Sequence, residues 1–265
     1  MFTNVRIFSL YFAQFLKSRL EYKIDFIADI FANLVTALSG LLFIVFLMDG
    51  EQIKTLRGWS REEVFFIYGY SLIPMAIFSS VALNLYRFGD RYVIQGGFDR
   101  VLLRPLNSLG QILFESFNLE SIGSLAVAIV LLTYCMNRLG IEFNSIDYLW
   151  LFISSISGAV ILLAVFVILA SLSFHFEDRL GISAPVFNLI RFGRYPLPIF
   201  NKLVQFVLKW IVPFAFVAFY PATHFLRRKE FLVYCYASPL IAVIFACLAW
   251  RLWQFGVSKY SSTGN

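Results

Sequence analysis

Residues 148–174 form the longest apolar stretch of this chain and include no Asp, Glu, Lys, Arg or His. About 20 apolar residues in a helix are enough to cross the hydrocarbon core of a bilayer. Small residues, which permit close packing of helices in lipid, gather in its first half: Ser154, Ser155, Ser157, Gly158 and Ala159. We therefore predict a transmembrane helix over this range.

The composition of the whole chain agrees with a lipid environment. Of its 265 residues, 60% are hydrophobic and only 14% are charged, whereas soluble domains are about 45–50% apolar and about 25% charged. The sequence therefore predicts an all-α integral membrane protein with a single transmembrane domain over residues 1–265. Its net charge of +6 fits this class, since basic residues collect on the cytoplasmic side. A nucleic-acid partner is not expected, because the basic residues are scattered between apolar stretches.

The sequence offers no catalytic, cofactor-binding or metal site. It lacks the GxxxxGK[ST] phosphate loop and the HExxH zinc motif. Its three cysteines and two histidines are too dispersed for a metal site. Ser157-Gly158 lacks the glycine that a GxSG nucleophile motif requires at position 155. We expect that the chain is not an enzyme.

The apolar stretches predict six membrane spans, and the positions of five of them are clear from hydropathy. An amphipathic helix over 4–20, with its apolar side chains on one face, is expected to lie in the membrane interface before the first span. The third span contains Glu115 and Glu120 near its start, and we expect these to face protein, water or headgroups. The five spans are 24–48, 63–86 (with Pro74 inside), 111–136, 148–174 and 231–255.

Three polar residues of the first span, Asp25, Asp29 and Asn33, follow one another at steps of four and therefore share one helix face. One interpretation is a stripe that faces a partner near the interface. The other is the polar lining of a substrate path or a subunit contact.

The position of the fifth span is open from the residues alone. Apolar content favours 197–220, but Lys202, Gln205 and Lys209 form one polar stripe there. Lys209 near mid-membrane would cost about 2.5–3.5 kcal/mol, and Pro213 would break the helix. The alternative is a short span over 177–193, followed by an amphipathic hairpin over 196–220. The distribution of basic residues favours the first reading, and the polar stripe and Pro213 favour the second.

One compact polar segment, residues 87–107, separates the second and third spans. Gly96 and Gly97 allow a tight turn, and Pro105 stops any helix that follows. Between them, Phe98, Val101 and Leu102 form an apolar face at helical spacing, with charged residues Asp99, Arg100 and Arg104 beside it. This pattern predicts a short helix that a partner outside the membrane binds.

Two patterns resemble the permease family of type-2 ABC transporters. Gly97-Phe98-Asp99 with Leu102-Leu103-Arg104-Pro105-Leu106 is similar to its G…LLRPL signature. Tyr195-Pro196-Leu197, Pro213 and Tyr220-Pro221-Ala222 resemble its YP…P…YPA pattern. The two patterns occur in the order that the family has, and the likeness extends over nearly the whole chain.

The resemblance implies a six-helix membrane subunit of an ABC exporter in the plasma (inner) membrane of a bacterium, with both termini cytoplasmic. Its expected partners are an ABC ATP-binding subunit, which holds ATP and Mg, a second permease that is identical or related, and membrane lipid. It also implies a cytosolic coupling helix within 87–107 and an outer re-entrant hairpin over 196–220, which favours 177–193 as the fifth span. The expected ATPase-coupling residues are Gly97, Phe98, Asp99, Arg100, Leu102, Arg104 and Pro105.

The cargo implied by the aromatic, apolar interior is a hydrophobic or amphipathic molecule. Two other classes of function are considered: a structural or assembly membrane protein, and a channel or secondary carrier. A carrier is expected to hold ionisable groups at mid-membrane, whereas Asp29, Glu115 and Glu120 lie near the ends of spans.

Overall fold

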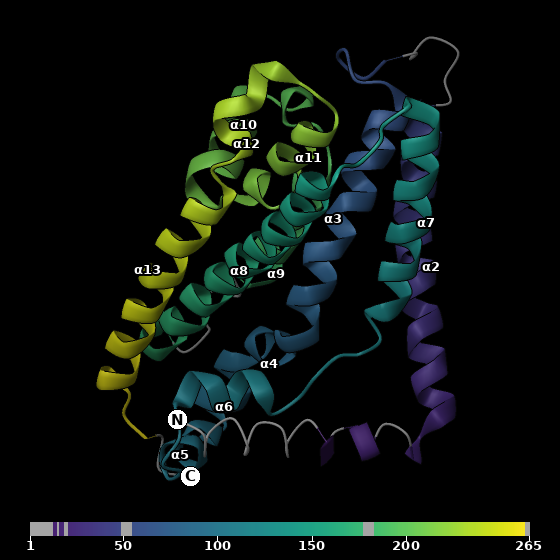
Figure 1. Ribbon diagram of the computed structural model, residues 1–265. Coiled ribbons are helices and arrows are strands. Elements are labelled where there is room, and N and C mark those ends of the chain that lie inside the picture. Colours follow the sequence, from purple (N-terminus) through teal and green to yellow (C-terminus); the bar gives the residue numbers. More distant parts are fainter. Residues whose placement is uncertain (1–12, 15, 19–20, 49–54, 177–182, 263–265) are drawn as a thin grey trace.

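The computed structural model describes residues 13–14, 16–18, 21–48, 55–176 and 183–262, and every regular element in these ranges is a helix. The expected interfacial helix over 4–20 and the first part of the expected span 177–193 lie largely or wholly outside the described residues. Five long apolar helices dominate Figure 1, and together they make the chain an all-α, multi-pass membrane protein. These are α2 (Lys23–Met48), α3 (Arg61–Val81), α7 (Ile122–Leu139), α8 (Ser145–Phe176) and α13 (Ser238–Lys259).

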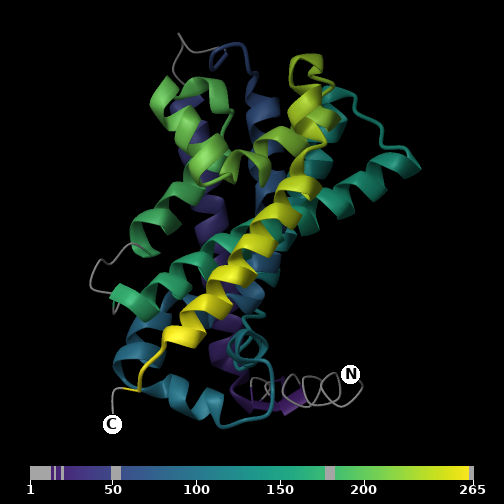
Figure 2. The same cartoon turned by 90° about the vertical axis from the view of Figure 1, so that its left-hand side faces the viewer.

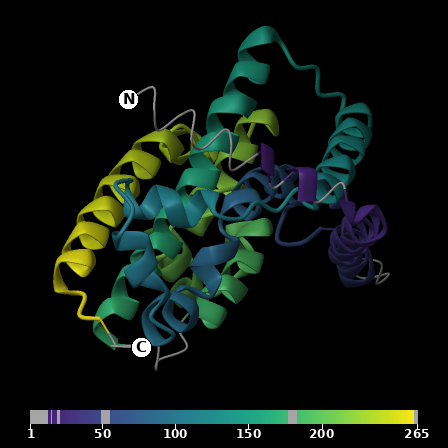
Figure 3. The same cartoon turned by 90° about the horizontal axis from the view of Figure 1, so that it is seen from below.

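The long helices form two groups that α3 connects. Helix α2 packs on α7, α13 packs along α8, and α3 contacts both α7 and α8. Figure 3, which views the molecule from the end that carries α5, shows α2 and α7 together at one side. Figure 2 shows α13 lying diagonally across the opposite face.

Local sequence signals set the ends of these helices. Ser60 and Glu63 form a capping box at the start of α3, in which each side chain accepts a hydrogen bond from the other's backbone N–H. Asn144 and Asp147 make the same exchange at the start of α8. Gly140, with φ of 63°, ends α7 in the left-handed conformation that glycine adopts without strain.

The third expected span, 111–136, is not one continuous helix. Helix α6 (Ser108–Phe114) ends before Glu115, and α7 begins only at Ile122. Within the interruption, the Asn118 backbone donates a hydrogen bond to the Ser80 carbonyl at 2.9 Å. Glu115 lies at this break, and its carboxylate accepts hydrogen bonds from Arg91 and Tyr92.

The segment after α8 is a series of short elements instead of a straight fifth span. Helices over Lys202–Ile211 and Phe214–Phe225 meet at an angle of 75°, and Pro213 lies at the bend. A straight helix over 197–220 is therefore excluded. The elements are α9 (Ser183–Ile190), η2 (Arg191–Arg194), η3 (Leu197–Ile199), α10 (Lys202–Phe206), η4 (Val207–Ile211), η5 (Phe214–Phe216), α11 (Phe219–Phe225), η6 (Lys229–Phe231) and α12 (Leu232–Cys235).

Helices α10, α11 and α12 gather at the end of the molecule opposite α5 (Figure 1). A close backbone approach fixes them to α8. A Cβ at Gly158 would lie 2.7 Å from the Val217 carbonyl oxygen, so only glycine fits there. The buried Tyr70 hydroxyl also donates to Ser154 at 2.7 Å, which joins α3 to α8.

Candidate coupling site

The polar segment 87–107 folds into two short helical elements. After α4 (Leu83–Tyr86) come a π-helical turn, η1 (Gly89–Ile94), and the short helix α5 (Gly97–Leu102). Gly96 turns the chain between them with φ of 68°. A Cβ on Gly97 would lie 2.5 Å from the Arg91 carbonyl oxygen, so the glycine pair permits α5 to pack directly on η1.

Phe98 lies inside the protein. Its side chain is fully buried, and its ring centroid is 5.0 Å from that of Phe174 in α8 and 6.1 Å from that of Trp253 in α13. The rings of Tyr260 and Phe88 lie 4.9 and 6.0 Å away. The expectation that Phe98 contacts a partner directly is therefore corrected, because its neighbours within the chain enclose it.

The exposed part of the segment is the end of α5 and the turn after it. Leu102 is 47% exposed and Leu103 is 85% exposed. The charged and turn-forming residues of this surface are also exposed: Arg100, Arg104 and Pro105. Leu103 was not among the expected coupling residues, because the helical spacing of Phe98, Val101 and Leu102 omits it.

Asp99 binds the end of the chain. Its two carboxylate oxygens accept hydrogen bonds from the Tyr260 hydroxyl at 3.0 Å and from the Ser262 hydroxyl at 2.6 Å. Burial, together with the neighbouring Asp99 carboxylate, raises the pKa of Tyr260 to about 12, so its hydroxyl stays protonated and can donate. Sequence reasoning missed this contact, since the two residues are 161 positions apart.

Arg91 and Glu115 connect the segment to the second and third spans. Arg91 donates to Glu115 at 3.1 Å and to the Asn84 side chain at 3.2 Å. The Tyr92 hydroxyl donates to the other Glu115 oxygen at 2.5 Å. Burial and this contact with Glu115 raise the pKa of Tyr92 above its ordinary range. Arg91 thus has a structural role, beyond adding a positive charge to a loop.

Helix α6 closes the site from the other side. The Gln111 amide donates to the carbonyls of Val101 and Leu106, each at 3.1 Å. The Trp253 indole donates to Ser108 at 3.1 Å. Through these contacts and the Phe98 cluster, the segment is attached to α6, α8 and α13.

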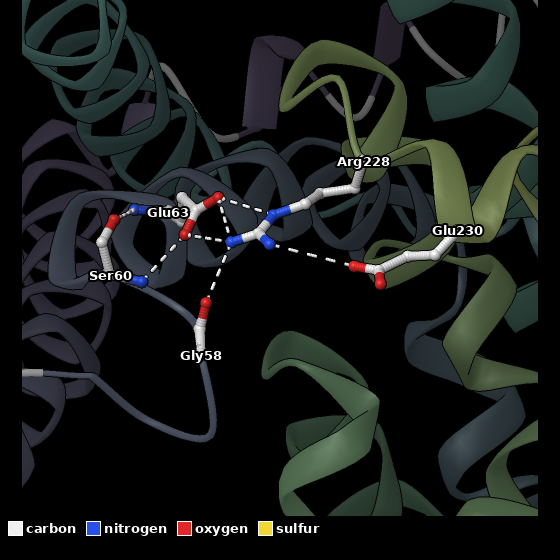
Figure 4. A network of polar contacts seen from close by, with 5 residues as sticks. All are labelled: Gly58, Ser60, Glu63, Arg228 and Glu230. Atoms are coloured by element: carbon white, nitrogen blue, oxygen red, sulfur yellow. Dashed lines mark hydrogen bonds and ion pairs between the residues drawn. The ribbon is translucent and has the colours of Figure 1, made fainter.

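A second polar cluster lies at the opposite end of the molecule (Figure 4). The Arg228 guanidinium donates to both oxygens of Glu63, at 2.9 and 2.8 Å, and to the Gly58 carbonyl at 3.0 Å. The bond to Glu63 raises the pKa of Arg228, which therefore stays charged. Because Glu63 also caps α3 through Ser60, this cluster joins the start of α3 to the turn after α11.

The polar face expected on the first span lies on α2. Asp25 and Asp29 are exposed near its first turns, and the Asn33 amide donates to the Asp29 carbonyl at 3.3 Å. Asn33 is partly covered by α7, where a Cβ on Gly123 would lie 3.4 Å from the Asn33 Cβ. Asn33 therefore lies where α2 meets another long helix.

The family model described as "ABC-2 family transporter protein" matches residues 33–264 of this chain. The chain belongs to the ABC-2 transporter family. The match includes both patterns on which the resemblance rested, and the resemblance is confirmed. No curated protein and no solved structure matches the chain.

Members of the ABC-2 family are membrane subunits that are not themselves catalytic, and they work in general with an ABC ATP-binding subunit. The described residues of this ABC-2 protein hold no group of three or more His, Cys, Asp or Glu side chains that could bind a metal ion. The surface of α5 presents both apolar and basic side chains at one end of the long helices, and it is therefore the candidate contact for the ATP-binding subunit.

Proposed function

We propose that this ABC-2 protein is the permease subunit of an ATP-driven exporter of a hydrophobic or amphipathic molecule. A separate ATPase subunit, with its own ATP and Mg, would bind the surface formed by Arg100, Leu102, Leu103, Arg104 and Pro105. One observation carries the proposal: directly behind this exposed surface, Phe98 is buried against α8 and α13.

This arrangement suits the transmission of force. A coupling element has to be rigid, because a flexible loop would absorb the movement of the ATPase. Packed aromatic side chains resist deformation, and α5 is fixed by the Phe98 ring cluster, by Asp99 and by Gln111. A displacement of α5 would therefore move α8 and α13 with it.

The membrane arrangement that we propose has six spans, with residues 183–193 as the described part of the short fifth span over 177–193. Residues 196–220 would form a re-entrant hairpin on the outer side, which the 75° bend at Pro213 supports. The start of α2, helix α5 and the end of α13 lie at one end of the molecule (Figure 1), which we assign to the cytoplasm. A second permease, identical or related, would complete the transporter in the bacterial plasma membrane.

Co-purification with the ATPase subunit tests this proposal. Arg100→Glu reverses an exposed charge on the proposed surface and should reduce the amount of ATPase that a tagged permease retains. Lys202→Glu makes the same change of net charge at the opposite end and should leave that amount unchanged. Arg100 is a cleaner target than Asp99, because changing Asp99 would also release Tyr260 and Ser262.

A structural or assembly protein, a channel or a secondary carrier needs no ATPase. If the wild-type permease, expressed together with the candidate ATPase, retains no ATPase through purification, the exporter proposal is contradicted. Equal retention by the Arg100→Glu and Lys202→Glu variants would contradict the proposed surface while leaving the family's general partnership with an ATPase intact.

A further inference from the structure

Arg194 is a cation inside the bundle that lacks a matching anion among the described residues. It lies in η2, and the groups near enough to act on it electrostatically include Tyr68, Tyr86, Tyr195 and the second cation Arg191. The Arg194 Nε atom is buried and has no hydrogen-bond partner.

The position of Arg194 is well within the length of the long helices. The neighbouring Tyr68 belongs to α3, and its hydroxyl donates at 2.7 Å to the carbonyl of Ala37, near the middle of α2. A cation at such a depth is costly to desolvate unless an anion or several dipoles compensate it. In membrane proteins, charges of this kind mark the paths of substrates and ions.

A narrow apolar crevice adjoins Arg194. Its walls include Met75, Leu162, Ile190 and Phe214, and Ser71 is the other polar side chain that lines it. The free space is about 10 Å³, which is room for one water-sized group. A carboxylate or phosphate oxygen therefore fits beside the guanidinium.

The backbone that carries Arg194 is held closely against the hairpin. A Cβ on Gly193 would lie 2.8 Å from the Phe214 carbonyl oxygen, so glycine is needed for this approach. Beside the site, the ring of Tyr195 contacts that of Phe43 on α2 at 6.5 Å, and Phe43 is 57% exposed. Tyr195 and Phe43 therefore place apolar surface beside the part-buried Arg194 and extend it to the outside of the bundle.

We propose that Arg194 binds the negatively charged headgroup of an amphiphile, whose hydrocarbon chain lies along the exposed apolar surface at Phe43 and Tyr195. The charge of Arg194 selects an anion over a neutral group, and the apolar surroundings select an attached hydrocarbon chain over a free inorganic ion. The assignment of this amphiphile as the exported cargo rests on the proposed function. The binding of the amphiphile at Arg194 does not depend on that function.

Binding of oleate and of oleyl alcohol to the purified permease in phosphatidylcholine nanodiscs tests the inference. These probes share a hydrocarbon chain and differ in charge. The wild type should bind oleate more tightly than oleyl alcohol. Arg194→Gln should raise the Kd for oleate by about tenfold or more, because a charge-assisted bond is lost. The same change should leave the Kd for oleyl alcohol unchanged.

Arg191→Gln is the matched control, because it removes the same charge from an exposed position in the same short helix. It should weaken oleate binding much less than Arg194→Gln does, because Arg191 does not line the crevice. If Arg194→Gln does not fold, Arg194→Lys is the alternative test, since it keeps the charge but not the planar guanidinium. It should weaken oleate binding without changing the binding of oleyl alcohol.

Phosphatidylglycerol added to the nanodisc distinguishes two sources of the anion. Competition with oleate in the wild type assigns the site to a bilayer lipid, and absence of competition assigns it to a single-chain amphiphile. Equal affinity for oleate and oleyl alcohol in the wild type, or normal oleate binding by both Arg194 variants, would overturn the inference. These assays contain no ATPase, so failure of the proposed coupling would leave their result intact.

Discussion

The rings of Phe98 and Phe174 meet edge to face, with their centroids 5.0 Å apart. Phe98 is the second residue of the short helix α5, and Phe174 lies near the end of the long helix α8. The contact therefore connects a surface outside the long helices directly to one of the longest of them. Edge-to-face packing of this kind stabilises a pair beyond its buried area.

Replacing Phe98 should show how much this connection contributes to stability. Phe98→Ala leaves a cavity between α5, α8 and α13, and we expect the free energy of unfolding to fall by about 3–5 kcal/mol. Phe206→Ala, at a position that is 54% exposed, should change it much less. Thermal or denaturant unfolding of both variants in the same detergent compares them, and equal losses would contradict the account of Phe98 as an internal anchor.

The hydrogen bond between Tyr260 and Asp99 predicts a pH-dependent contribution to stability. The pKa of Tyr260 in the folded protein is about 12, compared with about 10 for an unperturbed tyrosine. Its protonated form is therefore favoured by folding. The contribution should be complete below about pH 10 and be lost as the pH rises through the folded pKa.

Tyr260→Phe removes the hydroxyl and keeps the ring that packs on Phe98. At neutral pH we expect the variant to be less stable by about 0.5–1.5 kcal/mol. The difference from the wild type should shrink between about pH 10 and pH 12. Unfolding measured across this range checks the prediction, and a difference that stays constant up to pH 12 would argue against it.

The Arg228–Glu63 pair should stabilise the attachment of α11 to α3. Arg228→Gln removes two hydrogen bonds to a carboxylate, and we expect a loss of about 1.5–3 kcal/mol together with faster amide exchange over residues 219–235. Arg228→Lys should restore only part of this, since lysine lacks the planar fork. Lys229→Gln, at an exposed neighbouring position, is the control.

A double-mutant cycle with Glu63→Gln separates the pair from its surroundings. The two substitutions should be less than additive, because each removes the same interaction. Full additivity would show that Arg228 and Glu63 act independently, despite the 2.8 Å contact between them.

Much of the fold was accessible from the sequence because lipid imposes long apolar helices. The ranges of α2 and α8 agree closely with two expected spans, since each contains a long apolar run. The short helix expected between Gly96 and Pro105 is also present as α5. In these cases the residues that specify the helix, an apolar run or a flanking Gly and Pro, lie within or next to the helix itself.

Other features depend on contacts between distant parts of the chain. The helical spacing of Phe98, Val101 and Leu102 indicated an apolar face, but not which side other helices cover. The structure buries Phe98 and Val101 and leaves Leu102 half exposed. Likewise, at the break before α7, Glu115 bonds to residues that lie 23 and 24 positions earlier, and hydropathy does not record such contacts.

The central claim is that the exposed end of α5 transmits the action of an ATPase to this permease. The most direct measurement is ATP hydrolysis by the purified ATPase with the permease in nanodiscs. Leu103→Asp alters the most exposed apolar residue of this surface, and Leu203→Asp alters a 71% exposed leucine at the opposite end. We predict that the wild type and Leu203→Asp change the rate of hydrolysis equally, whereas Leu103→Asp, still folded, does not change it. An unaltered effect of Leu103→Asp, or no effect of the wild type, would contradict the claim.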